Sequence, residues 1–556
     1  MGGLLAVVLL VALGVGGYQL YERWEGRRLV RRAEAFLSGG DAKSAALTAR
    51  RAFQMNSSNL EACRVLARIA EQEGQSSAIE FRQHVMAITP ASIDDGIALA
   101  KTALQFHKIA LAESALAKLG PEGARLATYY EVKARIAAAK KDSLSAEKNF
   151  AEAAKLEPSN KSYQFSLAVY QLQSSSPEIR SGASKLLQQL MEDKAFRVPA
   201  ARALRDDAAQ RKDLPTLLRV SELLHDYPEA TFQDRVSHAQ VLHTLNRPDF
   251  ARRLTDLQNE ALSDPNNMTY LVSWMITNHL TLLALHWINE LPPEVLTKRL
   301  VPAAVADCYV AINDWDGLQK WCQKTKWESF EFLRHAYLSR VLREKGDKRG
   351  ATSEWDTALQ QVGSNGERLH GLEQVAVKWG WEKEAEDLLW RLSKDEEQQY
   401  EALAALYQYY AEKGITEGLY RVVERLCEIE PDDMKAQNNF TQLSLLLNRN
   451  LKHAHEVAEQ LYRKDPTNEP FASTYAFSLY RKSKFQEAAK VMSALKPEEL
   501  QTPGVAAYYG VFLAAAGDKS RAAEYLKKGS EAEASLLPEE KVLLQNARNK
   551  VNGNQP

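Results

Sequence analysis

The chain has 556 residues, with 71 Lys and Arg against 72 Asp and Glu, a formal net charge of −1 and 45% apolar residues. This composition is typical of globular proteins, and the balanced charge disfavours a nucleic-acid partner, which usually requires a basic domain or stripe. The four cysteines contain no Cys-x-x-Cys pair, which disfavours a disulfide framework or a zinc site and indicates reduced core residues.

Residues 1–22 predict a transmembrane anchor. No charged residue occurs in residues 2–21, and about 20 helical residues span about 30 Å, the thickness of a bilayer hydrocarbon core. A cleaved signal peptide is the alternative, although no Lys or Arg precedes the apolar run. Several arginines follow it instead in the basic juxtamembrane segment 23–32. By the positive-inside rule, we expect a single-pass membrane protein with its repeats in the cytoplasm, and a periplasmic or extracytoplasmic location is the alternative.

Beyond this segment, small residues recur about every 34 positions. In residues 130–137 and 146–153, apolar residues follow intervals of three and four, which predicts two amphipathic helices with a turn near Lys141. The recurring register, at intervals of 33 to 35 within its two blocks, comprises Ala45, Ala78, Ala112 and Ala146, then Ala284, Leu318, Ala351, Ala385, Leu419, Ala454, Ala488 and Ala522. Small residues at one helical position allow two helices to approach closely.

Glycine and proline mark the two ends of the predicted helices. Five glycines fall where the first helix of a unit should end in a left-handed residue, and four prolines fall where the second helix should end. The glycines are Gly40, Gly346, Gly380, Gly414 and Gly517, and the prolines are Pro90, Pro158, Pro431 and Pro466.

A 34-residue helix-turn-helix unit with recurrent small residues, an aromatic residue in the second helix and a closing proline resembles the tetratricopeptide repeat (TPR) family. Residues 35–59, 129–160 and 507–529 carry the resemblance best. It implies an all-α, right-handed α-solenoid of about fifteen units over residues 33–536. The pattern weakens in residues 160–264, where Ser174–Pro177 resembles an insertion. Residues 537–556 are expected to form a capping helix and tail.

No motif for catalysis occurs in the sequence. The phosphate loop, the dinucleotide-binding fingerprint, the nucleophile elbow and the His-Glu-x-x-His motif are all missing. His453 and His455 lie two positions apart on a predicted helix and therefore point in different directions, which is poor metal geometry. We expect no enzymatic activity, no cofactor and no metal.

The TPR resemblance also implies that a partner binds the concave surface, which is lined by the first helix of each unit. The corresponding positions do not reproduce the clamp of Lys, Asn and Arg with which known TPR proteins hold a peptide carboxylate, so capture of a peptide C-terminus is disfavoured. Arg340 and Arg343 could form an anion-binding pair, or a solvated or salt-bridged pair. The candidate positions are Arg135, Asp307, Arg340, Arg343, His370, Gln374, Gln408, Asn439, Phe477 and Arg481.

Nine of the ten tryptophans lie between Trp274 and Trp390. Three of them, Trp287, Trp321 and Trp355, recur at intervals of 34 at a second-helix position and are predicted to be core residues. By contrast, Trp379 and Trp381 flank Gly380 in a predicted turn. We expect these two side chains to be partly exposed and to form a contact patch.

Charge is unevenly distributed along the chain. Residues 382–433 contain fifteen Asp and Glu against six Lys and Arg, whereas residues 23–51 are basic. The basic end suits anionic lipid, and the acidic stretch could attract a basic partner. Solvated helix faces are the alternative for both.

Together these features predict a membrane-anchored TPR scaffold that mediates protein–protein interactions. Its layout is similar to that of bacterial anchored TPR proteins of envelope assembly. The expected partners are a protein or peptide on the concave surface and the membrane through residues 2–21, with no nucleic acid. An extracytoplasmic TPR component of polysaccharide export or protein secretion is one alternative, and a regulatory or carbohydrate-binding helical-repeat protein is another.

Overall fold

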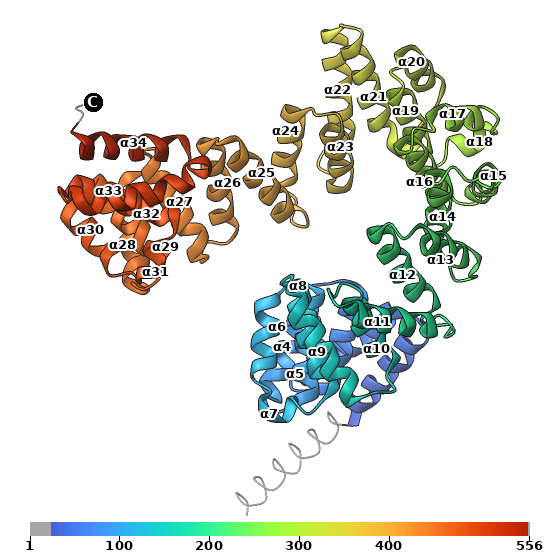
Figure 1. The fold of residues 1–556 in the computed structure, drawn as a ribbon, viewed down its shortest axis with the longest axis horizontal. Helices are drawn as coiled ribbons and strands as arrows, with labels where there is room; N and C mark the ends of the chain where they lie inside the picture. Colours follow the sequence, from blue (N-terminus) through green and yellow to red (C-terminus); the bar gives the residue numbers. More distant parts are fainter. Residues whose placement is uncertain (1–23, 554–556) are drawn as a thin grey trace, which may run out of the picture. The chain divides into compact units, whose positions relative to one another are not determined.

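The computed structural model describes residues 24–553, which form α-helices and short 3-10 segments without any strand. The predicted membrane anchor in residues 2–21 lies outside this described part. None of the helices within residues 24–553 combines the length and the apolar character needed to cross a bilayer. The chain divides into two compact units, with the boundary between Ser263 and Asp264. Figure 1 shows the helices coloured along the sequence.

The first unit is a stack of seven helical hairpins. Within the hairpins the two helices pack against each other, and inside the unit each second helix also packs against the hairpin that follows it. The hairpins are residues 24–38 with α2 (Ala42–Met55), α3 (Leu60–Gln72) with α4 (Ser77–Ile88), α5 (Ile93–Gln105) with α6 (Ile109–Ala117), α8 (Ala127–Ala139) with α9 (Ser143–Leu156), α10 (Lys161–Gln171) with α11 (Pro177–Leu190), α12 (Arg197–Arg211) with α13 (Leu214–Asp226), and α14 (Phe232–Thr244) with α15 (Phe250–Ala261). The short helix α7 (Gly120–Gly123) links the third and fourth hairpins.

The second unit contains eight further hairpins followed by a terminal helix, α34 (Pro538–Asn552). The hairpins are α16 (Pro265–Thr277) with α17 (Thr281–Asn289), α19 (Val301–Ala311) with α20 (Trp315–Lys324), α21 (Glu331–Glu344) with α22 (Lys348–Val362), α23 (Gly366–Lys378) with α24 (Glu382–Leu392), α25 (Gln399–Lys413) with α26 (Thr416–Ile429), α27 (Met434–Leu446) with α28 (Leu451–Lys464), α29 (Glu469–Arg481) with α30 (Phe485–Ser493), and α32 (Pro503–Ala516) with α33 (Lys519–Gly529). Short segments join some of them: α18 (Pro293–Leu296), η1 (Glu328–Phe330), α31 (Pro497–Leu500) and η2 (Ser530–Ser535).

Seven hairpins in one unit and eight in the other give fifteen within the described residues, which agrees with the predicted number of units. All twelve residues of the small-residue register are buried, with exposed fractions of 7% or less. The weakly patterned residues 160–264 form three ordinary hairpins. The apparent insertion at Ser174–Pro177 leads into α11, where the Ser176 hydroxyl accepts a hydrogen bond from the Ile179 N–H as the N-cap.

A left-handed residue closes the first helix in fourteen of these hairpins. The five predicted glycines all have positive φ angles, between 65° and 92°. Other hairpins place a non-glycine residue at the same point, as in His107, Lys141 and Asn313. The hairpin of α10 and α11 is the exception. The backbone of this turn therefore recurs even where its amino acid changes.

The cysteines are free, and Cys63, Cys308 and Cys322 are buried, while Cys427 is partly buried. Burial raises the pKa of the Cys322 thiol to about 12, so the thiol stays protonated at neutral pH. The interpretation of these cysteines as reduced core residues agrees with this environment.

Candidate partner-binding groove

A hollow lies along the first helices of four consecutive hairpins in the second unit. Helices α16, α19, α21 and α23 contact one another in sequence order and enclose a volume of about 650 Å³. Its wall includes Asp307, His370 and Gln374, three of the positions expected on the partner-binding surface. Asp307 and His370 thus line the same hollow although they lie on different hairpins and more than 60 positions apart in the sequence. We refer to this hollow as the α16–α23 groove.

Asp307 organises the floor of the α16–α23 groove. The Tyr337 hydroxyl donates a hydrogen bond of 2.7 Å to Asp307 Oδ1, and Lys378 Nζ lies 2.7 Å from Asp307 Oδ2. Burial, together with the Asp307 carboxylate, raises the pKa of the Tyr337 phenol well above its usual value, so the phenol remains a donor. One carboxylate therefore connects α19, α21 and α23.

His370 and Gln374 lie one turn apart on α23 and are both exposed. The Gln374 side-chain amide lies 2.9 Å from His370 Nε2, and His370 Nδ1 lies 3.5 Å from a carboxylate oxygen of Glu373. Burial raises the pKa of Glu373. This wall offers hydrogen-bond donors and acceptors to a partner above the fixed floor.

Arg340 and Arg343 do not line the groove, although both were candidates. Arg340 pairs with Glu344 at 3.0 Å, and Arg343 pairs with Glu384. The Arg343 guanidinium carbon lies 3.7 Å from the centre of the Trp381 ring. The salt-bridged alternative is therefore correct for these arginines, which pair with neighbouring carboxylates and lie against indole rings.

The prediction of an exposed tryptophan patch is wrong for Trp381, which is only 6% exposed. Trp379 is partly buried and packs edge-on against both Trp381 and Tyr337, with ring centres 5.0 Å apart in each case. The left-handed turn at Gly380 folds both indoles back onto α21 and onto Arg340. As predicted for core residues, Trp287 and Trp355 are buried.

Trp321 is only partly buried. Its indole Nε1–H donates a hydrogen bond of 3.0 Å to the Pro302 carbonyl, which fixes the side chain between α19 and α20. The core prediction for this third tryptophan holds in part.

Phe477 was also expected on the partner-binding surface, and this expectation is wrong. The side chain is 1% exposed, and its ring centre lies 5.5 Å from Tyr508 and 6.5 Å from Phe512. Here the first helices α29 and α32 pack directly on each other. Aromatic side chains therefore fill the space that would otherwise be open to a partner.

The remaining candidates lie elsewhere. In the first unit, Arg135 is exposed on α8, pairs with Glu131 at 2.8 Å and lines a separate hollow with Arg82 and Lys101. Gln408 is exposed on α25 and donates to Glu412 Oε1 at 2.8 Å. The Arg481 side chain is partly buried at the end of α29. Asn439 lines a second hollow of the second unit, which is described below.

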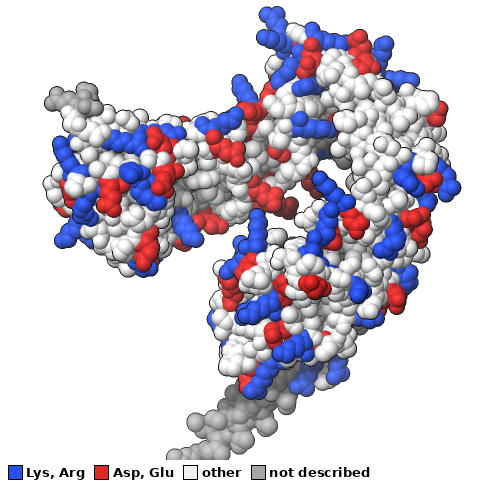
Figure 2. All heavy atoms as spheres, in the orientation of Figure 1, with Lys and Arg blue, Asp and Glu red and all other residues white. Residues whose placement is uncertain are grey.

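Acidic and basic side chains are intermingled on the face shown in Figure 2. Five of the fifteen acidic residues in the stretch 382–433 form ion pairs in the described structure. Glu382 pairs with Lys413 at 3.0 Å, and Asp387 pairs with Arg391 at 2.8 Å. Carboxylates without an ion pair in the described structure occur along the stretch, as in residues 395–397 and 430–433.

Comparison with known protein families and with curated proteins finds no match. Among solved structures, Pseudomonas aeruginosa PilF is similar at 15% identity and a TM-score of 0.33, over 39% of this chain and 97% of that chain. The APC/C hetero-tetramer Cut9-Hcn1 is similar at 11% identity and a TM-score of 0.28, over 95% and 98%. Both similarities are weak. The recurring hairpins themselves define the class of this protein, an all-α protein built of repeated helical hairpins, and they agree with the TPR resemblance found in the sequence.

Proposed function

We propose that the chain is a membrane-anchored scaffold that binds a partner protein in the α16–α23 groove and has no catalytic activity of its own. The α16–α23 groove carries this proposal. The contacts of Asp307 with Tyr337 and Lys378 join three of its helices, and His370 and Gln374, which also line it, are exposed. A preformed surface lowers the entropic cost of binding because little of the receptor must become ordered.

Site-specific photo-crosslinking in the full-length chain tests the proposed groove. A photoreactive residue at Gln374 lies in the groove, whereas the matched control at Thr352 is exposed on α22, a second helix. We expect a defined protein to be crosslinked from Gln374 and not from Thr352. Equal crosslinking from both positions, or none from Gln374 in the native membrane, would contradict the proposal.

The membrane anchor in this proposal is the uncharged segment 2–21, and the arginines that follow it favour a cytoplasmic location for the repeats. A C-terminal reporter that is active on one side of the membrane tests this orientation. Detection of the N-terminal segment in the mature protein tests whether the anchor is retained. An extracytoplasmic reporter signal would overturn the orientation and favour an export or secretion machine.

A further inference from the structure

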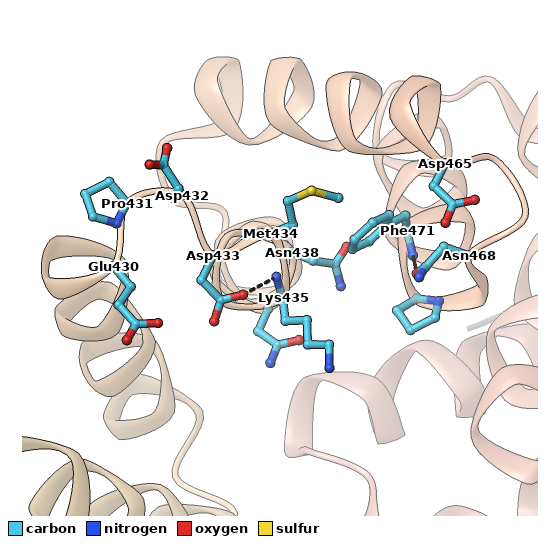
Figure 3. Close-up of a pocket in the computed structure, with 12 residues that line it drawn as sticks. Glu430, Pro431, Asp432, Asp433, Met434, Lys435, Asn438, Asp465, Asn468 and Phe471 are labelled. Atoms are coloured by element: carbon cyan, nitrogen blue, oxygen red, sulfur yellow. Dashed lines mark hydrogen bonds between the residues drawn. The ribbon is translucent and has the colours of Figure 1, made fainter. Parts of the chain in front are cut away.

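A second hollow in the second unit lies between the N-terminal ends of α27 and α29, with a volume of about 1000 Å³. Figure 3 shows the residues that surround it. Met434 and Phe471 supply apolar surface, and acidic side chains come from the turns that precede the two helices. Its charged lining residues are Glu430, Asp432, Asp433, Asp465 and Lys435. We refer to this hollow as the α27–α29 pocket.

Asn438 is the unexplained group in this pocket. Its side chain is only 3% exposed, and Oδ1 has no hydrogen-bond partner in the described chain. The amide lies between Met434 and Phe471 and faces the hollow (Figure 3). A buried amide oxygen without a donor is destabilising. This oxygen therefore points to a donor supplied by a ligand.

Two carboxylates that line the pocket, those of Asp433 and Asp465, have free capacity to accept hydrogen bonds. Asp433 Oδ1 accepts from the backbone N–H of Lys435 at 2.8 Å. Asp465 Oδ1 accepts from the backbone N–H and the hydroxyl of Thr467, at 3.2 and 2.8 Å. Within the described residues, these bonds stay inside each turn and engage one oxygen of each carboxylate. The pocket thus combines acceptors, an excess of negative charge and an apolar wall.

We propose that the α27–α29 pocket binds a lysine or arginine side chain from an extended segment of a partner protein. The cationic head supplies N–H donors to Asn438 Oδ1 and to the carboxylates of Asp433 and Asp465. The methylene stem packs against Met434 and Phe471. A metal ion is disfavoured, since no group of three His, Cys, Asp or Glu side chains in residues 24–553 is arranged to hold one. This inference rests on the proposed scaffold function and specifies the chemistry of its partner.

The test uses the full-length chain in lipid nanodiscs and fluorescent peptides of eleven residues, blocked at both ends. The peptides carry a central Leu-Lys-Leu or Leu-Arg-Leu in a Gly-Ser background, and the matched control carries norleucine in place of the cation. Fluorescence anisotropy should show that the cationic peptides bind at least tenfold tighter than the norleucine peptide. Their affinity should fall as salt is raised. Equal binding of the three peptides, or no binding at millimolar peptide, would overturn the proposal.

Two sets of variants locate the binding site. Asn438→Leu should weaken binding of the lysine peptide at least tenfold while the melting temperature stays unchanged or rises, because an unpaired polar group is removed. Thr474→Val is the matched control, since Thr474 Oγ1 on α29 is also buried and unpaired but does not line the pocket. The affinity of the Thr474→Val variant for the lysine peptide should equal that of the wild type. A purely structural role for Asn438 would instead lower the melting temperature and leave the affinity unchanged.

The double variant Asp433→Asn with Asp465→Asn removes charge without depending on a buried substitution. Asparagine can still cap α27 at position 433 and accept the turn hydrogen bonds at position 465. It should lose the preference for the cationic peptides. Asp347→Asn, at the N-cap of α22, is the matched control and should retain it. Failure of these experiments while Gln374 still crosslinks a partner would refute the pocket and leave the scaffold intact. Peptide binding without any crosslink from Gln374 would refute the α16–α23 groove instead.

Discussion

Left-handed residues at the hairpin turns show how single positions shape this protein. The same turn occurs with glycine at Gly40 and with a lysine at Lys212, whose φ is 58° and ψ is 31°. A side chain in this region costs roughly 1–2 kcal/mol relative to the right-handed helix, a penalty that glycine avoids. The non-glycine turns are therefore strained positions that the packing of each hairpin maintains.

Replacing Lys212 by glycine should stabilise the first unit by roughly 0.5–1 kcal/mol, because the relief of backbone strain exceeds the extra flexibility that glycine gives the unfolded chain. Lys212 is exposed, so little packing is lost. Urea unfolding followed by circular dichroism measures the change. As the reciprocal control, Gly40→Ala should destabilise the same unit. A loss of stability in Lys212→Gly would show that the lysine side chain stabilises the fold by more than the backbone strain of the turn destabilises it.

His238 is a second informative residue. It is 3% exposed on α14, its Nδ1 lies 3.0 Å from the Ser221 hydroxyl, and its ring centre lies 5.3 Å from that of His225. Burial, with smaller contributions from His225 and Arg253, lowers the pKa of His238 to about 4. The folded chain therefore holds this imidazole in its neutral form at neutral pH.

The first unit should lose stability as the pH falls from about 6.5 to about 4. In this range the unfolded chain binds a proton at His238 that the folded chain does not, so protonation favours unfolding, by up to roughly 3 kcal/mol. Urea unfolding at several pH values should show a smaller loss for His238→Gln than for the wild type. The exposed His453 provides the control, His453→Gln, which should follow the wild type. If the free energy of unfolding depends on pH in the same way for all three proteins, this role of His238 is excluded.

At the scale of elements, α34 closes the second unit. It packs against α32 and α33 and buries Leu544 and Ala547. Its first turn also reaches distant helices, since Glu539 accepts from the Thr416 hydroxyl at the start of α26. A terminal helix of this kind covers the apolar end of the last hairpin, which would otherwise be exposed to solvent.

The Tyr508 hydroxyl is central to this closure. It donates to Glu540 Oε1 at 2.6 Å and accepts from the Gln442 side-chain amide at 3.1 Å, joining α32, α34 and α27. Tyr508→Phe should destabilise the second unit by about 1–3 kcal/mol, because it leaves two partly buried polar groups unpaired. Urea unfolding followed by tryptophan fluorescence reports on this unit. Tyr407→Phe, at an exposed tyrosine, should change stability little, and an equal effect of both variants would argue against the closure.

At the scale of the whole molecule, the described chain divides into two compact units. Residues 29–69 form a hydrophobic cluster in the first unit, and residues 403–547 form another in the second. In repeat proteins each hairpin contacts mainly its neighbours, so stability is a sum of local terms. We therefore expect each unit to fold when it is expressed alone.

Residues 24–263 and 264–553, expressed separately, should each give a helical circular dichroism spectrum and a cooperative thermal transition. A fragment that is unfolded or aggregates when expressed alone would show that its fold depends on the other unit.

The sequence was sufficient to predict the hairpin architecture. The 34-residue period, the buried small-residue register and the glycine turns all reflect contacts within one hairpin or with the next one, so the pattern of nearby residues encodes them. The same periodicity also placed Asp307, His370 and Gln374 on first helices, and these three do line one groove.

The burial of Phe477 and Trp381, the neutralisation of Arg343 and the unpaired amide of Asn438 could not be predicted in this way. A repeat register specifies the helix position of a residue, but not which side chains the neighbouring hairpins bring against it. Arg343 meets Glu384 from 41 positions away, and Tyr508, which covers Phe477, is held by Gln442 from 66 positions away. Such contacts depend on the stacking of successive hairpins, and this stacking determines which first-helix positions remain open to a partner.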